Sequence, residues 1–240
     1  MAAYAGIDNF DSYSDGFLNG GNGGSGWSDA WTNGTNGAQN TVQGLTTFDG
    51  SAKAVLITTL SNQETFITRN LTSSVDSGNL YIAARMAIGT DSLSGLFLRS
   101  SGGTIGAQAR IGLNKLNINS TVSTDLLSGI STDTWYIFHL EFLSSTTFRA
   151  RYKVSGGSWN SFTSTLTYAS SVSSPSQISF YSSGEASSTN PFYWDVLGDT
   201  DPEPAEGPAN LKSLDTNVKA NIKSYNTNVL ANIKSINGNS

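Results

Sequence analysis

Apolar and polar side chains alternate with a period of two along most of the first 199 residues. Between residues 80 and 88, Leu80, Ile82 and Ala84 fall on one face, whereas Tyr81 and Arg85 fall on the other. The same alternation recurs in the segments 96–99, 107–114, 134–142, 148–154, 177–182 and 192–197. Alternation of this kind is typical of strands with one buried face. Clusters of Gly, Ser, Asn and Asp separate the segments, so we predict an all-β, antiparallel sandwich of two sheets.

The segment 135–154 predicts a hairpin with a definite register. Glu141 and Arg149 both stand in the outward phase and can pair directly across the two strands. Because a shift by one residue would place outward residues opposite inward ones, this pair fixes the others. The remaining predicted pairs are His139 with Arg151 and Ile137 with Lys153, around a turn centred on Ser145.

Composition divides the chain into three zones. Residues 1–199 carry the aromatic residues and the alternation, residues 200–210 are acidic and rich in Pro, and residues 211–240 repeat with a period of 11. We therefore predict a sandwich domain, an extended linker and a tail for assembly or docking. From residue 208 onward, four lysines stand against one aspartate, a net charge of +3. A basic tail on an acidic body suggests that the two face different partners.

The repeat of the tail predicts a helix. Apolar side chains recur at spacings of 3, 4 and 4 residues, and about 3.67 residues per turn is the period of a helix with a right-handed supercoil. These positions are Leu211, Leu214, Val218, Ile222, Tyr225, Val229, Ile233 and Ile236. Since Asn, Ser and Thr are poor helix formers, such a helix needs copies of itself or a host assembly to pack on. Short Ile-Lys-Ser strands with a turn at Asn237-Gly238 are the alternative.

Composition and charge narrow the function classes. The chain has 240 residues, a net charge of −5, 13% charged residues and no cysteine. It has no broad basic field, which disfavours a nucleic-acid partner, and disulfide scaffolds and thiol chemistry are excluded. We expect neither a secretory signal nor membrane insertion, because we find no basic, apolar leader and no run of about 18 apolar residues. Release by lysis, as for virion proteins, fits this pattern; a chain that has lost its signal is the alternative.

Three segments resemble concanavalin A-like lectin/glucanase domains of the LamG type. Residues 7–31, IDNFDSYSDGFLNGGNGGSGWSDAW, are similar to the opening of such domains, residues 132–159 to their hairpin, and residues 190–199 to their closing strand. The resemblance implies a jelly-roll sandwich whose first and last strands lie side by side. In the tail, strings of the type Asn-Ile-Lys-Ser-x-Asn-Gly resemble the short repeats at the ends of some phage structural proteins.

Aromatic residues surround the glycine-rich part of the opening segment. The glycines before Trp27 let the chain turn through positive φ, so Trp27 and Trp31 can fold back over Phe10, Tyr13 and Phe17. We predict a satellite aromatic core that anchors the long loop, in preference to a sugar platform.

The catalytic motif of the glucanase branch, Glu-x-Asp-x-x-Glu, is absent. The glutamates of the chain are Glu64, Glu141, Glu185, Glu203 and Glu206. None has a second carboxylate two residues later in a strand, so the paired carboxylates of glycoside hydrolysis are missing. A zinc site is implausible, because His139 is the single histidine and cysteine is absent. We predict that the protein is not an enzyme and has no cofactor except a candidate Ca²⁺.

Residues outside the core phase provide two candidate sites. If their strands form one sheet, aromatic and charged side chains share an outer face suited to sugar stacking and to carboxylate or sulfate recognition. They are Tyr81, Arg85, Phe97, Arg99, Arg110, Trp135, His139, Glu141, Arg149 and Arg151. A surface ladder of cross-strand charge pairs is the alternative. Asp8, Asp11 and Asp195 are candidate Ca²⁺ ligands, with ordinary loop carboxylates as the alternative.

These features together predict a structural display protein, a virion component such as a capsid decoration or a tail appendage. The tail would fasten it to copies of itself and to other virion or surface-assembly proteins. The sandwich would then be displayed on the virion surface, with glycans as a further partner. The first alternative is a carbohydrate-binding module of a cell-surface adhesin or filament, outside the cell. The second is a glycan hydrolase or lyase with an unfamiliar active site.

Overall fold

The computed structural model describes residues 2–34, 40–48, 51–58, 64–87, 92–170, 172–184 and 191–203. The chain divides into two compact units, Met1–Pro202 and Glu203–Ser240, and the fold described here is that of the first. The predicted helical repeat 211–240, with its eight apolar assembly positions, lies outside the described residues. Most of the predicted linker 200–210 lies outside them as well.

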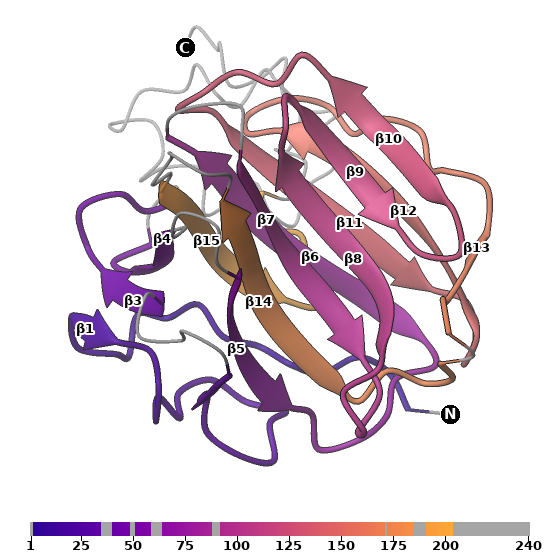
Figure 1. Ribbon diagram of the computed structural model, residues 1–240, viewed down its shortest axis with the longest axis horizontal. Helices are drawn as coiled ribbons and strands as arrows, with labels where there is room; N and C mark the ends of the chain where they lie inside the picture. Colours follow the sequence, from indigo (N-terminus) through magenta and orange to yellow (C-terminus); the bar gives the residue numbers. More distant parts are fainter. Residues whose placement is uncertain are drawn as a thin grey trace, which may run out of the picture. The chain divides into compact units, whose positions relative to one another are not determined.

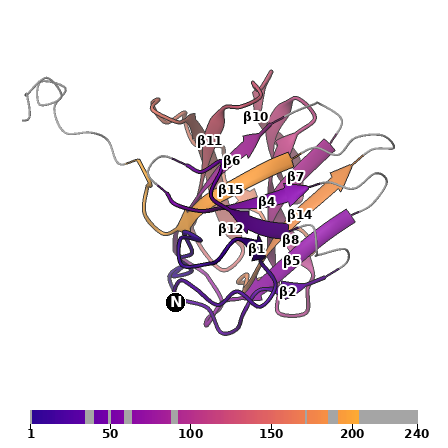
Figure 2. The same ribbon diagram turned by 90° about the vertical axis from the view of Figure 1, so that its left-hand side faces the viewer.

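Two antiparallel sheets stack on each other (Figure 1, Figure 2). The eight-stranded sheet has the order β1 (Gly16–Phe17), β3 (Asn40–Gln43), β4 (Ala54–Thr58), β15 (Pro191–Gly198), β6 (Gly78–Met86), β11 (Trp135–Phe142), β12 (Thr147–Val154) and β13 (Leu166–Thr167). The seven-stranded sheet has the order β10 (Ser123–Ser128), β9 (Lys115–Asn119), β8 (Ile105–Gly112), β7 (Ser92–Arg99), β14 (Gln177–Gly184), β5 (Glu64–Asn70) and β2 (Thr32–Asn33). The described residues contain no helix, and the predicted all-β, antiparallel, jelly-roll-type sandwich is confirmed. Within these residues there is accordingly no helical segment that could span a membrane.

The alternating apolar positions form the core between the sheets. In β6, Leu80, Ile82 and Ala84 are completely buried, as the alternation predicts. Burying such apolar side chains contributes about 25 cal/mol per Å² removed from water, which makes this inner layer the main source of stability. Trp194 of β15 also donates a hydrogen bond across the core to Ser94 Oγ of β7, at 2.8 Å. The sequence of β15 thus ties one sheet to the other.

The predicted hairpin register is confirmed. In the β11–β12 pair, Glu141 lies opposite Arg149, and His139 lies opposite Arg151. The backbone N–H of Leu143 donates to the carbonyl of Thr147 at 3.0 Å, which closes the turn around the predicted centre. The charge pair therefore identified the register correctly, because only one phase keeps the apolar face inward.

Eight of the described strands escaped the period-two analysis: β1, β2, β3, β4, β5, β9, β10 and β13. The predicted strand 107–114 is also too long, because β8 ends at Gly112 and Leu113 has a left-handed φ of 50°. A tight β8–β9 turn follows there, and Gly129 N–H, directly after β10, donates to the carbonyl of Asn114 in this turn. β3 and β10 are largely polar, whereas β4 is a continuous apolar run, so neither type shows a clear alternation.

Candidate functional site

The ten residues predicted to form one carbohydrate-binding face lie on two different sheets. Tyr81, Arg85, Trp135, His139, Glu141, Arg149 and Arg151 belong to β6, β11 and β12 of the eight-stranded sheet. Phe97, Arg99 and Arg110 belong to β7 and β8 of the seven-stranded sheet. The expectation of one shared face is therefore wrong. Each strand had the right alternation, but alternation does not reveal to which sheet a strand belongs.

On the eight-stranded sheet, the centre of the outer face is covered by the protein's own side chains. Phe48, Ala83 and Ile137 form a small buried cluster, on which Trp135 and Trp159 pack. His139 is 3% exposed and stacks on Tyr81 with ring centroids 4.1 Å apart. Burial, with the nearby Arg151, lowers the pKa of His139 to about 4, so its ring is neutral at physiological pH. This region is a second small core.

The charged residues of the same face pair with one another. Arg149 Nε donates to Glu141 Oε2 at 2.5 Å, and Arg85 Nη2 lies 2.6 Å from Asp133 Oδ1. The guanidinium of Arg151 lies 4.3 Å from the ring centroid of Phe162. Of these contacts, Glu141–Arg149 is a cross-strand charge pair of the kind that the alternative interpretation expected.

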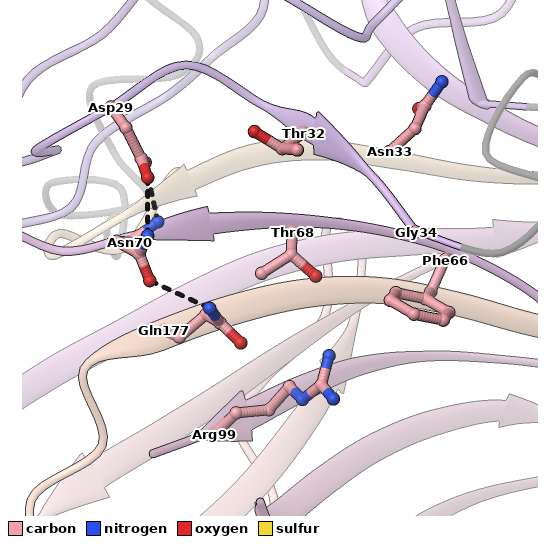
Figure 3. Close-up of a pocket in the computed structure, with 9 residues that line it drawn as sticks. All are labelled: Asp29, Thr32, Asn33, Gly34, Phe66, Thr68, Asn70, Arg99 and Gln177. Atoms are coloured by element: carbon pink, nitrogen blue, oxygen red, sulfur yellow. Dashed lines mark hydrogen bonds between the residues drawn. The ribbon is translucent and has the colours of Figure 1, made fainter. Parts of the chain in front are cut away.

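The outer face of the seven-stranded sheet is open at a pocket of about 290 Å³. It lies where β2, β5, β14 and the end of β7 meet (Figure 3). The lining side chains provide a carboxylate, amides, hydroxyls, one guanidinium and one aromatic ring. The lining residues are Asp29, Thr32, Asn33, Gly34, Phe66, Thr68, Asn70, Arg99 and Gln177. Few polar groups at fixed positions beside an apolar surface are characteristic of small-molecule sites.

A row of hydrogen bonds fixes one end of the pocket. Asn70 donates from its backbone N–H to Asp29 Oδ1 at 2.9 Å and from its side chain to Asp29 Oδ2 at 2.5 Å. Gln177 Nε2 in turn donates to Asn70 Oδ1 at 2.8 Å. Figure 3 shows these three side chains in a row at one end of the pocket. Because their geometry is set before any ligand arrives, the ordering entropy of binding is reduced.

An aromatic ring and a guanidinium define the other end. Arg99 Cζ lies 5.4 Å from the ring centroid of Phe66, and Figure 3 shows both side chains directed into the same space. Arg99 Nη1 donates to Ser179 Oγ at 3.2 Å, and Ser179 Oγ lies 2.7 Å from Thr68 Oγ1. Gly34 admits the ring, because a Cβ at this position would meet Phe66 Cε2 at 1.9 Å. The close approach explains why glycine occupies this position.

The pocket is held in place by a buried arginine on the opposite side of β5. Arg69 is 1% exposed, and its Nη1 donates to Asp8 Oδ2 at 2.8 Å. Its Nε donates to the carbonyl of Asp29 at 2.7 Å, and its guanidinium lies 4.8 Å from the ring centroid of Trp27. The glycine-rich opening segment is thereby fastened to the strand that carries the pocket.

The predicted satellite aromatic core is present, with one exception. Phe10 and Trp31 are almost completely buried, and Trp27 packs on Trp31 at 5.8 Å between ring centroids. Phe17 is 69% exposed and takes no part. It lies in β1 at the edge of the eight-stranded sheet, so its strand directs it away from the cluster.

The three aspartates proposed as calcium ligands do not converge. Both Asp11 and Asp195 accept a hydrogen bond from Ser51 Oγ, at 2.9 and 3.2 Å. Asp8 is engaged in the ion pair with Arg69. No group of three metal-ligating side chains occurs in the part of the chain that the structure describes. The calcium site therefore stays a prediction.

The pocket contains mostly residues that the sequence did not single out. Of its lining, only Arg99 was a candidate. Phe66, Thr68 and Asn70 do share the outward phase of β5, which was a usable signal. It was concealed because the inward phase contains Arg69, a residue that usually lies at the surface.

No protein-family model and no curated protein sequence matches the chain. Among solved structures, a chain described as a sialidase matches with a TM-score of 0.55 and 9% identity. The match covers 85% of the present chain and only 19% of the sialidase chain. A β-glucanase from Bacillus licheniformis matches at TM-score 0.47 and 10% identity, over 79% of this chain and 99% of that one. The carbohydrate-binding module CBM66 from Bacillus subtilis matches at TM-score 0.42 and 11% identity, over 70% of this chain and 92% of that one.

The likeness to the sialidase chain supports the two-sheet sandwich described above and, at 9% identity, shows the fold alone. It also corrects the prediction that the protein is not an enzyme, because that chain is an enzyme by name. One missing motif does not exclude catalysis. A fold hosts many active sites with different residues, so the missing Glu-x-Asp-x-x-Glu excludes only one of them.

Proposed function

We propose that the protein binds carbohydrate in the pocket on the outer face of the seven-stranded sheet. The observation that carries this proposal is the combination of the Phe66 ring with fixed amide and hydroxyl groups in one pocket of about 290 Å³. A pyranose presents an apolar C–H face to a ring and hydroxyl groups to its surroundings. The lining offers both kinds of contact. Of the ten candidate carbohydrate-binding residues, Arg99 lines this pocket on the seven-stranded sheet.

Beyond the pocket, an aromatic pair extends the same face. Phe97 of β7 stacks on Tyr181 of β14 with ring centroids 4.6 Å apart. Tyr181 hydroxyl donates to Glu64 Oε1 at 2.8 Å, which fixes its ring. A glycan longer than one unit would pass from the pocket towards this pair.

The test is a glycan array followed by calorimetry on wild type and two variants. Phe66→Ala should weaken binding by about tenfold, since an aromatic contact is worth about 0.5–1.5 kcal/mol. Trp135→Ala removes an aromatic residue from the other sheet and is the matched control, with unchanged affinity. A protein that binds no glycan, or whose binding is lost in Trp135→Ala and kept in Phe66→Ala, contradicts the proposal. A reducing-sugar assay on each bound glycan reports whether binding leads to hydrolysis.

We further propose that residues 208–240 attach the sandwich to an assembly, as in a virion component that displays a glycan-binding domain. The support is the 11-residue repeat and the net charge of +3 in the sequence. Deletion of residues 208–240 should abolish oligomerisation or incorporation while glycan affinity is kept. A plain secreted or cell-surface module would lose neither property. The native mass of the full-length protein and that of the variant without residues 208–240 distinguish these outcomes.

A further inference from the structure

Arg99 differs from most other cations of the sandwich in its surroundings. Six described basic side chains form ion pairs: Lys53, Arg69, Arg85, Lys115, Arg149 and Lys153. Arg99 forms none with the residues that the structure describes, although it lines a pocket. Burial lowers the pKa of its guanidinium. A half-buried cation without a counter-charge favours an anion.

The guanidinium is also oriented for a ligand. Its Nε donates to the carbonyl of Gly103 at 2.8 Å, and its Nη1 donates to Ser179 Oγ. Guanidinium has five N–H donors in a planar fork, so further donors are available for a two-point contact with a carboxylate or sulfate. The ring of Phe66 beside it restricts the approach to one side. The pocket's own carboxylate, Asp29, is at the far end and accepts from Asn70.

We propose that this pocket selects glycans that bear a carboxylate or sulfate group, with the anion bound by Arg99 beside the ring of Phe66. The inference rests on the proposed function and specifies its substrate class. Selectivity follows from differential desolvation, since a neutral sugar leaves the half-buried guanidinium without a counter-charge, whereas an acidic sugar supplies it.

A second arginine extends the inference to longer glycans. Gly95 of β7 pairs with Arg110 of β8, and Phe97 pairs with Gln108, so Arg99 and Arg110 lie on either side of the Phe97 ring along the sheet. Four residues of strand separate the two positions along β7, about 13 Å at 3.3 Å per residue. Arg110 is also without an ion pair in the described part of the chain; its Nε donates to Gln108 Oε1. A glycan with repeated acidic groups would reach both.

The experiment uses the full-length protein and two matched pairs of probes. The first pair is oligogalacturonate and its methyl ester, and the second is sulfated and unsulfated isomalto-oligosaccharide. Wild type should bind at least one charged probe about 10- to 100-fold more tightly than its neutral partner, as expected for a charge-assisted contact. Arg99→Gln should remove this difference, and Arg99→Lys should keep part of it. Arg110→Gln should weaken only the longer oligomers.

The controls separate this inference from its premise. Arg85→Gln removes the same charge from the opposite face, so it should leave the preference intact; an equal loss in this variant would indicate unspecific attraction and overturn the inference. Thermal melting checks that Arg99→Gln is folded, and Arg99→Lys gives the readout if it is not. Equal affinity for charged and neutral partners, or a preference that survives Arg99→Gln, overturns the inference and leaves carbohydrate binding standing. Failure to bind any glycan of the array overturns both.

Discussion

The two outer faces of the sandwich carry similar residue types, yet they are built for different ends. On the eight-stranded sheet, rings and charges satisfy one another: Tyr81 stacks on His139, and Arg149 pairs with Glu141. On the seven-stranded sheet, Arg99 and Phe66 surround an open pocket. Aromatic and basic residues therefore indicate a binding face only where they do not already satisfy one another's contacts.

The reason for the difference lies in what covers each sheet. The segment with Phe48 and the segment with Trp159 cover the centre of the eight-stranded sheet. On the other sheet, the opening segment lies along one edge, where Asp29 accepts hydrogen bonds from Asn70 of β5 and the short β2 pairs with β5. The pocket lies beside this edge, between β2, β5, β14 and the end of β7.

The largest effect is expected where the pocket depends on a buried ion pair. Arg69→Met should lower the free energy of unfolding by about 3–5 kcal/mol, because it leaves the buried Asp8 carboxylate without its counter-charge. Denaturant unfolding measures the loss. Arg85→Met, which breaks an exposed pair on the other face, is the control and should cost below about 1 kcal/mol. Equal losses would refute the supporting role given to Arg69.

Truncation of one aromatic residue on each face sharpens the comparison. Phe48→Ala should cost about 3 kcal/mol and leave glycan affinity unchanged, because Phe48 is 1% exposed within the covering cluster. Phe66→Ala should cost about 1 kcal/mol and weaken binding, because its ring is half-buried at the pocket. Chemical unfolding and calorimetry on both variants test this. The reverse pattern would show that the faces have been assigned wrongly.

The pH dependence of the free energy of unfolding tests Asp195, which accepts a hydrogen bond from Phe48 of the covered face. Burial raises the pKa of Asp195 to about 7, although hydrogen bonds from Phe48 N–H and Val196 N–H partly offset this. The native carboxyl therefore holds its proton above the pH at which the unfolded one loses it. Stability from this group is lost as pH rises from about 4 to 7. We expect the free energy of unfolding of wild type, minus that of Asp195→Asn, to fall by up to a few kcal/mol between about pH 4 and 7. A difference that does not change with pH would contradict the raised pKa.

The smallest effect is expected for the ladder of surface charges. Glu141→Gln should change the free energy of unfolding by less than about 1 kcal/mol, since Arg149 and Glu141 are both partly exposed. Salt should reduce the difference further. A loss of about 3 kcal/mol or more, as expected when a buried pair is broken, would show that this pair belongs to the covered core. Denaturant unfolding at low and high NaCl provides the measurement.

Much of the fold was accessible from the sequence because alternation and charge pairing are local. The alternation predicted the buried face that contains Leu80, Ile82 and Ala84. The pair Glu141 and Arg149 predicted the hairpin register. Short polar strands such as β3 and β10 were missed, because few residues in them carry a periodic signal. β5 was missed because Arg69 stands at a core position.

Local sequence sets which side of each strand faces inward, since this depends on neighbours two residues apart. Which strands share a sheet follows from the three-dimensional fold, because strand order is set by contacts between segments far apart in the chain. Arg85 and Arg99 have equivalent outward phases, yet one pairs with Asp133 and the other lines a pocket with Asp29 and Phe66. The site exists because the glycine-rich opening segment packs on β5 through Arg69, and no local pattern encodes that contact.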